Sequence, residues 1–234
     1  EYVNWFDDDD LMLEDFLKIK LSSFTNKINF VICSGYYVNA ELKDSKLIVL
    51  NERADLSKDY VLWKLQILTP SILFKKNYLI NEKLFTYNIT RGQETEMFSR
   101  LFFKLPVSSY KIVNKPLFLY KQHENTKTAT NKEYIKSFKE SQSYITIENF
   151  KKSLELKDSE LVNYCYKSLI DFYFRGIENN HNDNSKYILI NLISILKNID
   201  KLVSFKLFIF GKLFLLFNRG SYNMEKKMKS YKFI

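Results

Sequence analysis

The chain has 234 residues, of which 46% are hydrophobic and 16% aromatic, enough to build a sizeable core and to argue against global disorder. Five glycines and three prolines are too few for the turns of an all-β sandwich, so a helix-rich mixed fold is favoured. Cys33 and Cys165 make neither a disulfide framework nor a metal motif, and both are predicted to be buried thiols in a reducing compartment.

The formal net charge of +9 is unevenly distributed. Residues 1–130 hold 18 Lys and Arg against 16 Asp and Glu, a net charge of +2, whereas residues 131–234 hold 18 against 11, a net charge of +7. The first part therefore carries a clustered negative site in a balanced background. The basic second part indicates an anionic partner such as a membrane surface.

Short strands and short helices alternate along the first half of the chain. Strand patterns cover residues 1–6, 30–40, 46–51, 72–74, 110–113 and 117–120. Helical spacing covers residues 11–21, 60–68, 75–79 and 93–103. Pro70 ends the second of these helices, because proline lacks an amide donor and restricts the residue before it. The first half is therefore predicted to be mixed α/β.

From about residue 132 the spacing of apolar residues becomes helical. Asp158 is a plausible N-cap for a helix that includes Leu161, Cys165 and Leu169. A polar loop at 179–185, in which His181 is predicted to lie at the surface, precedes helices at 187–196 and 202–217. The prediction is an α/β domain at residues 1–127 and a helical, basic extension at 128–234.

Four consecutive carboxylates, Asp7, Asp8, Asp9 and Asp10, follow an apolar strand directly. Such a run is costly unless water or a cation neutralises it, and hard cations such as Mg²⁺ or Mn²⁺ take oxygen ligands. Residues two apart in a strand point the same way, so Asp7 and Asp9 can face one pocket. The alternative is a solvated acidic start to the following helix, favoured by the helix dipole.

The stretch FDDDDLMLEDFL resembles the metal motif of family 2 glycosyltransferases of the GT-A fold, a D-x-D-D pattern followed by a helix. Asp7, Asp9 and Asp10 fall on its acidic positions. The resemblance implies that Asp9 contacts a Mn²⁺ or Mg²⁺ ion bridging the donor diphosphate, and that Asp7 helps to hold the donor. The family often has proline where this chain has Glu14. The implied fold is a truncated GT-A-like mixed sheet with flanking helices, followed by a helical region.

A second stretch, ITRGQETEMFSRLF, resembles the family segment that opens a helix with the catalytic base and ends it with an arginine. Glu94 takes the base position, where it would deprotonate the acceptor hydroxyl. Gln93 lies beside it among the acceptor-binding positions, and Arg100 closes the pattern. Glu96 is a competing base, although it aligns with a helix-face position. Glu94 could also simply favour a helix N-terminus.

Two further segments complete the resemblance, which covers residues 1–127. LFLYKQHENTKT resembles a strand leading to a histidine near the metal and diphosphate, which implies His123, although a lone surface histidine is the alternative. TPSILFKKNYL resembles the segment that shapes the acceptor pocket, which points to Thr69, Pro70 and Ser71. Trp63 is a candidate sugar-stacking platform, but it is more simply explained as a core residue.

The resemblance implies an inverting, metal-dependent hexosyltransferase that moves a sugar from a nucleotide-sugar donor to a glycan or lipid-linked glycan in bacterial-type surface polysaccharide synthesis. A Q-x-x-R-W motif of processive synthases is absent from the sequence, which favours transfer of single sugars. In the family, a Rossmann-like βαβ half that binds the donor base and ribose precedes the acidic motif, whereas this sequence starts at the motif. A non-catalytic interaction module without donor binding is therefore the main alternative.

Two other functions have less support. A basic nucleic-acid-binding protein is disfavoured because no nucleic-acid motif accompanies the scattered lysines. A metal-dependent phosphotransferase is disfavoured because no phosphate loop accompanies the aspartates. The apolar segment at 201–220 is interrupted by Lys206, Gly211 and Lys212, too often for a transmembrane span. It fits either a helix on an anionic membrane or a buried terminal helix. The expected location is the cytoplasm, with peripheral attachment to the inner face of the membrane.

Overall fold

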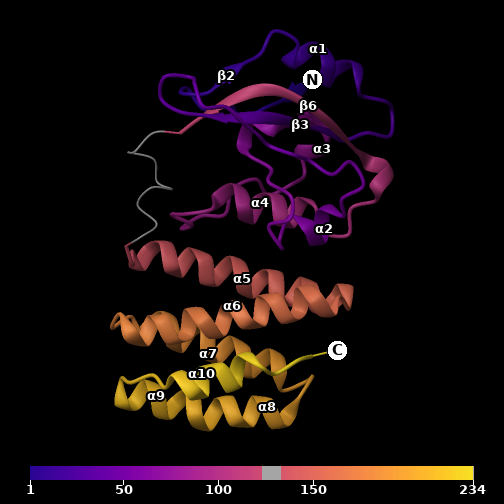
Figure 1. Ribbon diagram of the computed structural model, residues 1–234. Coiled ribbons are helices and arrows are strands. Elements are labelled where there is room, and N and C mark those ends of the chain that lie inside the picture. Colours follow the sequence, from indigo (N-terminus) through magenta and orange to yellow (C-terminus); the bar gives the residue numbers. More distant parts are fainter. Residues whose placement is uncertain (123–132, 234) are drawn as a thin grey trace. The chain divides into compact units, whose positions relative to one another are not determined.

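The computed structural model describes residues 1–122 and 133–233 (Figure 1). The chain forms two compact units. The first, the sheet unit, comprises Glu1–Thr86 and Glu96–Glu133, and the second, the helical unit, comprises Tyr87–Thr95 and Tyr134–Ile234. The sequence prediction placed a single boundary after residue 127, whereas the helical unit also takes in a short segment from the first half. A mixed α/β chain with C-terminal helices was predicted, and this is confirmed.

One mixed sheet organises the sheet unit. Among the described residues its strands are β1 (Tyr2–Val3), β2 (Leu11–Met12), β3 (Phe30–Val38), β4 (Lys46–Leu47), β5 (Ile72–Lys75) and β6 (Tyr110–Lys121). The order is β1-β5-β3-β6-β2, and β4 pairs with β3. Of the strand pairs in the described part of the chain, only β3–β6 is parallel. β3 is central and buried on both faces along Phe30 to Gly35, which explains its unbroken apolar run.

The sequence predicted two strands at 110–120, but β6 is one continuous strand. Its register against β3 shifts between the Cys33–Val113 and Ser34–Pro116 pairs. Pro116 cannot donate a ladder hydrogen bond, so it is accommodated at this irregularity. Past it, the ring of Phe118 lies over Gly35, where a Cβ would be only 2.5 Å from Phe118 Cζ.

Short helices border the sheet. They are α1 (Phe16–Ser22), α2 (Leu56–Asp59), the 3-10 turn η1 (Thr69–Ser71), α3 (Lys76–Leu79), α4 (Gln93–Leu101) and the 3-10 turn η2 (Val107–Ser109). Two helix predictions were wrong in position. The helix predicted at 11–21 starts only at Phe16, because Leu11 and Met12 pair with β6 as β2. The helix predicted at 60–68 is replaced by α2, and Trp63 adopts a left-handed backbone (φ 58°) that no α-helix tolerates.

The helical unit contains α5 (Lys136–Leu156), α6 (Ser159–Glu178), α7 (Asn182–Leu196), α8 (Lys201–Lys206), the π-helical turn η4 (Leu207–Gly211), α9 (Lys212–Phe217) and α10 (Tyr222–Lys229). Asp158 caps α6 as predicted, since its carboxylate accepts from the Leu161 N–H at 2.9 Å. Helices α6 and α7 approach closely at Gly176, where a Cβ would clash with the Ser185 hydroxyl.

The surface position predicted for His181 is wrong. Its side chain is only 5% exposed. Nε2 lies 2.9 Å from Glu140 Oε1 and Nδ1 lies 3.1 Å from the Tyr134 hydroxyl. The helix α7 begins directly after His181, so the residues predicted as a polar loop are partly helical. Within it, Asn184 donates to the Ser143 hydroxyl and Ser185 donates to the Tyr173 carbonyl.

No helix among the described residues has the length and apolar character needed to cross a membrane.

Candidate metal centre

The acidic run lies between β1 and β2, in a turn closed by a 3.2 Å hydrogen bond from the Asp10 N–H to the Asp7 carbonyl. Because β2 pairs with the end of β6, the run is held against the sheet. Asp7, Asp9 and Asp10 each present one carboxylate oxygen within 4.8 Å of the others. This is the only such cluster of three among the described residues, and Asp8 is outside it.

Asp10 is the buried member of the cluster, only 6% exposed. Its Oδ1 accepts a hydrogen bond from the Lys121 N–H at 3.0 Å, while Oδ2 is buried without a hydrogen-bond partner in the described structure. Burial raises the pKa of Asp10 to about 6; the Lys121 hydrogen bond opposes this shift, and the charges of Asp9 and Asp7 add to it. A buried, unsatisfied carboxylate oxygen beside two further carboxylates is costly unless a proton or a cation satisfies it.

The donor set suits a hard divalent cation. Carboxylate oxygens are the ligands that Mg²⁺ and Mn²⁺ prefer, and such ions are commonly held by one or two carboxylates together with substrate phosphates. Asp7 and Asp9 are exposed to solvent, whereas Asp10 is buried. The three residues therefore fit a metal centre, with Asp10 anchored by the sheet and the other two at the surface.

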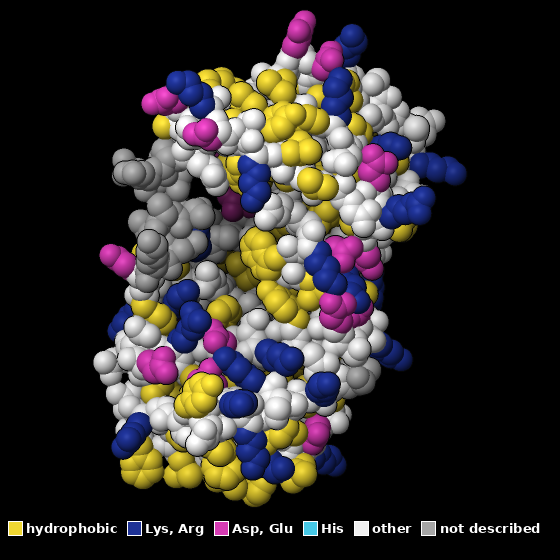
Figure 2. Space-filling view, viewed as in Figure 1, with side chains coloured by type: hydrophobic (Ala, Val, Ile, Leu, Met, Phe, Trp, Pro, Cys, Tyr) yellow, Lys and Arg dark blue, Asp and Glu magenta, His cyan; other side chains and the backbone are white. Residues whose placement is uncertain are grey.

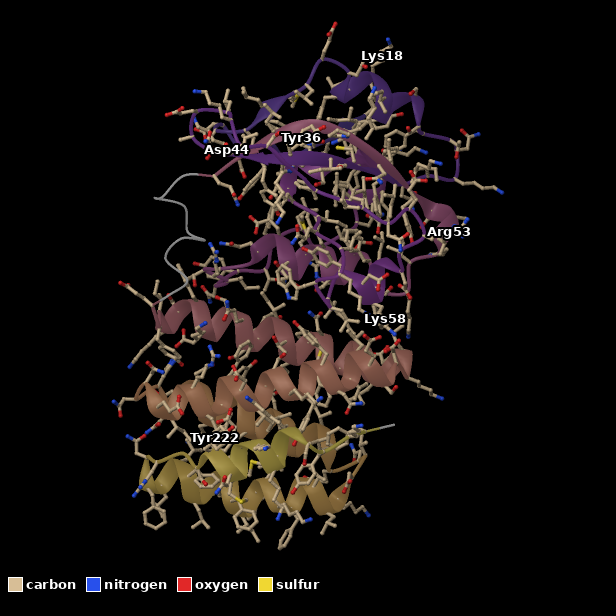
Figure 3. The ribbon with its side chains drawn as sticks, viewed as in Figure 1. Lys18, Tyr36, Asp44, Arg53, Lys58 and Tyr222 are labelled. Atoms are coloured by element: carbon tan, nitrogen blue, oxygen red, sulfur yellow. The ribbon has the colours of Figure 1, made fainter. Side chains whose placement is uncertain are left out.

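Two tyrosines adjoin the acidic cluster, and the sequence patterns did not identify them. Burial, together with the charges of Asp10, Asp7 and Asp9, raises the pKa of Tyr120. The ring of Tyr120 meets that of Tyr37 edge-on at 5.6 Å. Tyr37 in turn lines an open surface hollow with Asp44, Lys46, Gln66 and Gln122, and Figure 3 labels Asp44 close to this end of the sheet. The hollow therefore adjoins the acidic cluster through two aromatic rings.

The predicted acceptor segment forms η1 and leads into β5. Pro70 and Ser71 are buried, and the Ser71 hydroxyl accepts from the Leu68 N–H at 3.1 Å. Thr69 is half-buried. Trp63 is not the core residue that its type suggested, because its side chain is 61% exposed. Its ring is therefore accessible to a ligand.

Lys20 is a buried cation that the sequence analysis did not single out. Its side chain is 0% exposed, and Nζ donates to Asn4 Oδ1 at 3.0 Å and to the Pro70 carbonyl at 2.8 Å. Nζ also lies 3.7 Å from the centre of the Phe16 ring. Burial lowers the pKa of Lys20 to about 8, although the neighbouring Cys33 opposes the shift. The sequence does indicate that this position is buried, because Lys20 lies four residues after Phe16 and therefore on the apolar face of the same helix.

The two candidate bases differ in their environment. Glu96 is buried and forms an ion pair with Arg100 at 2.9 Å, and its second oxygen accepts from the Thr86 hydroxyl at 2.9 Å. These contacts give Glu96 a structural role. Glu94 and Gln93 are half-buried at the start of α4.

The structure brings together only part of the predicted site. Asp7, Asp9 and Asp10 are clustered in the sheet unit, which also contains Trp63 and the η1 segment, whereas Gln93 and Glu94 belong to the helical unit. His123 lies outside the described residues. The chain matches no protein-family model, and no curated protein matches it.

Proposed function

We propose that the chain is the metal-binding and acceptor-binding part of a GT-A-type glycosyltransferase that uses a nucleotide-sugar donor. The observation that carries the proposal is the acidic cluster with Asp10 buried and one of its oxygens unsatisfied. The order of the sequence motifs along residues 1–127 supplies the rest of the support. A solvated acidic run would leave all of its carboxylates in water, and Asp10 does not fit that alternative.

In this proposal, Asp9 and Asp10 hold the cation and Asp7 contacts the donor. A bound Mn²⁺ or Mg²⁺ ion would offset the negative charge that the leaving nucleoside diphosphate acquires. The open hollow beside Tyr37 offers Lys46 and amide groups to the polar parts of the donor. Thr69, Pro70, Ser71 and Trp63, all in the sheet unit, would shape the acceptor site.

Glu94 acts as the general base. It takes the proton from the acceptor hydroxyl while the hydroxyl oxygen attacks the anomeric carbon, and the bond from that carbon to the diphosphate oxygen breaks with inversion. Glu96 is excluded from this role because Arg100 and Thr86 already occupy its two oxygens. The acceptor is a glycan or a lipid-linked glycan.

Calorimetry with Mn²⁺ and a panel of UDP-, GDP- and dTDP-sugars tests the proposal. We expect one class of nucleotide sugar to bind only in the presence of metal. Asp9→Ala should abolish this binding, whereas Asp8→Ala, which removes an equal charge outside the cluster, should retain it. Binding that is equally strong with EDTA, or that survives in Asp9→Ala, would contradict the metal-dependent site. If Mn²⁺ binds but none of the nucleotide sugars does, the transferase assignment is contradicted.

A further inference from the structure

The outer face of α8, η4 and α9 exposes a continuous row of large apolar side chains. Their exposed fractions range from 38% for Ile209 to 75% for Leu216. The members of this outer face are Leu202, Phe205, Phe208, Ile209, Phe210, Leu213, Leu216 and Phe217. Figure 2 shows hydrophobic side chains gathered along the edge of the molecule formed by these helices. Single exposed apolar residues are ordinary, but a contiguous group of this kind marks an interaction surface.

The opposite side of the same helices is firmly packed within the helical unit. Val203, Leu207 and Gly211 are buried. The Tyr173 hydroxyl donates to the Gly211 carbonyl at 2.6 Å, and a Cβ on Gly211 would meet Leu189 at 2.5 Å. The apolar residues of the outer face are therefore not needed for packing inside the helical unit, because the opposite side of the same helices already makes those contacts. The outer face is left exposed to solvent.

The segment that carries this apolar row is strongly basic. Residues 201–234 contain eight Lys and Arg but a single acidic residue, Glu225. The exposed cations among the described residues of this segment are Lys201, Lys212, Arg219, Lys226, Lys227 and Lys232. Lys212 Nζ lies 4.3 Å from the centre of the Phe208 ring, so its stem runs along the apolar surface. Tyr222, labelled in Figure 3, adds an exposed aromatic ring at the start of α10.

We propose that the outer face docks on an anionic membrane surface, with α8 and α9 lying in the plane of the interface. Apolar side chains flanked by lysines are the composition that binds at this depth, with the rings and leucines among the acyl chains and the cations among the headgroups. The alternative occupant, a second copy of the chain, would place the same cations opposite one another, and this like charge opposes an isologous dimer.

Flotation with lipid vesicles tests this surface without reference to any enzymatic activity. We expect the full chain to float with vesicles of phosphatidylcholine containing 30% phosphatidylglycerol and to bind pure phosphatidylcholine at least tenfold more weakly. Raising the salt concentration from 0.1 to 1 M should weaken binding to the anionic vesicles, because the screening length falls from about 10 Å to about 3 Å.

Two variants separate the apolar and electrostatic contributions. The triple change Phe205→Ser, Leu216→Ser and Phe217→Ser should lower vesicle binding at least tenfold, because it removes side chains that reach the acyl region. The change Lys226→Gln with Lys227→Gln should lower binding to anionic vesicles by roughly fivefold for each lysine and leave the weak binding to neutral vesicles unchanged. Val107→Ser, at an equally exposed site in the sheet unit, is the matched control and should bind like the parent.

Circular dichroism checks that the variants are folded, which we expect because the substituted apolar side chains are more than half exposed. The proposal is overturned if the parent does not bind anionic vesicles at 0.1 M salt, or if the triple variant binds as well as the parent. It is also overturned if light scattering reveals a stable dimer that the triple variant dissociates and that does not bind vesicles.

Discussion

The Lys121 N–H donates a hydrogen bond of 3.0 Å to Oδ1 of Asp10, and so joins the end of β6 to the acidic run. This bond fixes one oxygen of the carboxylate and leaves Oδ2 buried without a partner. The last residue of the longest strand therefore determines where the acidic cluster lies. The bond also favours the charged form of Asp10, although burial outweighs it.

The raised pKa of Asp10 makes the stability of the metal-free chain depend on pH. The folded state binds the proton more tightly than the unfolded state, whose pKa is 3.8, so stability falls as the pH rises from about 4 to about 6. A shift of this size corresponds to about 3 kcal/mol. We expect Asp10→Asn to remove this dependence and to stabilise the metal-free chain at pH 7.5. Urea unfolding in the presence of EDTA at pH 4.5 and 7.5 measures the change in unfolding free energy with pH. The control variant Asp8→Asn should behave like the parent.

Replacing Lys20 should destabilise the sheet unit. Lys20→Ala opens a cavity and leaves the Pro70 carbonyl and Asn4 without their donor, a loss of about 2–4 kcal/mol in unfolding free energy. Lys18→Ala, on the exposed side of the same helix, should change stability by less than about 0.5 kcal/mol. Thermal unfolding of both variants distinguishes these outcomes, and equal melting temperatures would contradict a structural role for Lys20.

The buried Lys20 ammonium has the opposite pH signature to Asp10. Its folded pKa of about 8 lies below the ordinary value of 10.5, so the unfolded state binds more protons between these values. Stability from this group therefore rises as the pH increases from 8 to 10.5. We expect the difference in unfolding free energy between the parent and Lys20→Met to change by more than about 1 kcal/mol across this range. A difference that stays constant with pH would show that the ammonium is not desolvated.

Glu94 and Glu96 should respond differently to the same substitution. Glu94→Gln should leave stability and donor binding unchanged but lower sugar transfer by about 10²–10⁴-fold, because it removes the proposed base. Glu96→Gln should cost about 2–3 kcal/mol of stability, because it breaks the ion pair with Arg100. Release of nucleoside diphosphate measures transfer, and urea unfolding measures stability. Full transfer activity in Glu94→Gln would reject it as the base.

Gly35→Ala should be strongly destabilising. The added Cβ would lie 2.5 Å from Phe118, whose ring is completely buried and cannot move aside. Overpacking of this kind costs about 1–3 kcal/mol, and the pairing of β3 with β6 would be disturbed. Gly220→Ala is the control, since its Cβ would lie 3.3 Å from the nearest atom and require only a small shift. Melting temperatures of the two variants test the difference.

Local patterns predicted the elements whose packing follows from their own residues. The strands β3 and β5, the helix α4 and the capped helix α6 were all found from apolar spacing, turn residues and the Asp158 cap. What could not be predicted depends on partners that are distant in sequence. Residues 11–12 look helical but pair with β6, and His181 looks solvated but is enclosed by Tyr134 and Glu140.

The candidate site divides in the same way. The run of four aspartates identified the acidic cluster, but only the folded chain distinguishes the buried Asp10 from the exposed Asp8. The Lys121 contact involves a backbone N–H, which no residue type reveals. Trp63 was misplaced because its large ring suggests burial, whereas its left-handed backbone puts it in an exposed turn.

The parallel pairing of β3 with β6 has a consequence for the order of folding. Phe30 pairs with Tyr110, and β4, β5 and the helices α2, α3 and α4 lie between them in the chain. During synthesis the apolar β3 therefore emerges long before its principal partner, with one edge open to other chains. The helices α5 to α7 contact their sequence neighbours and can form quickly. We therefore expect a chain released before β6 is complete to expose an edge of β3 to pairing with other chains, a hazard that the helical unit does not share.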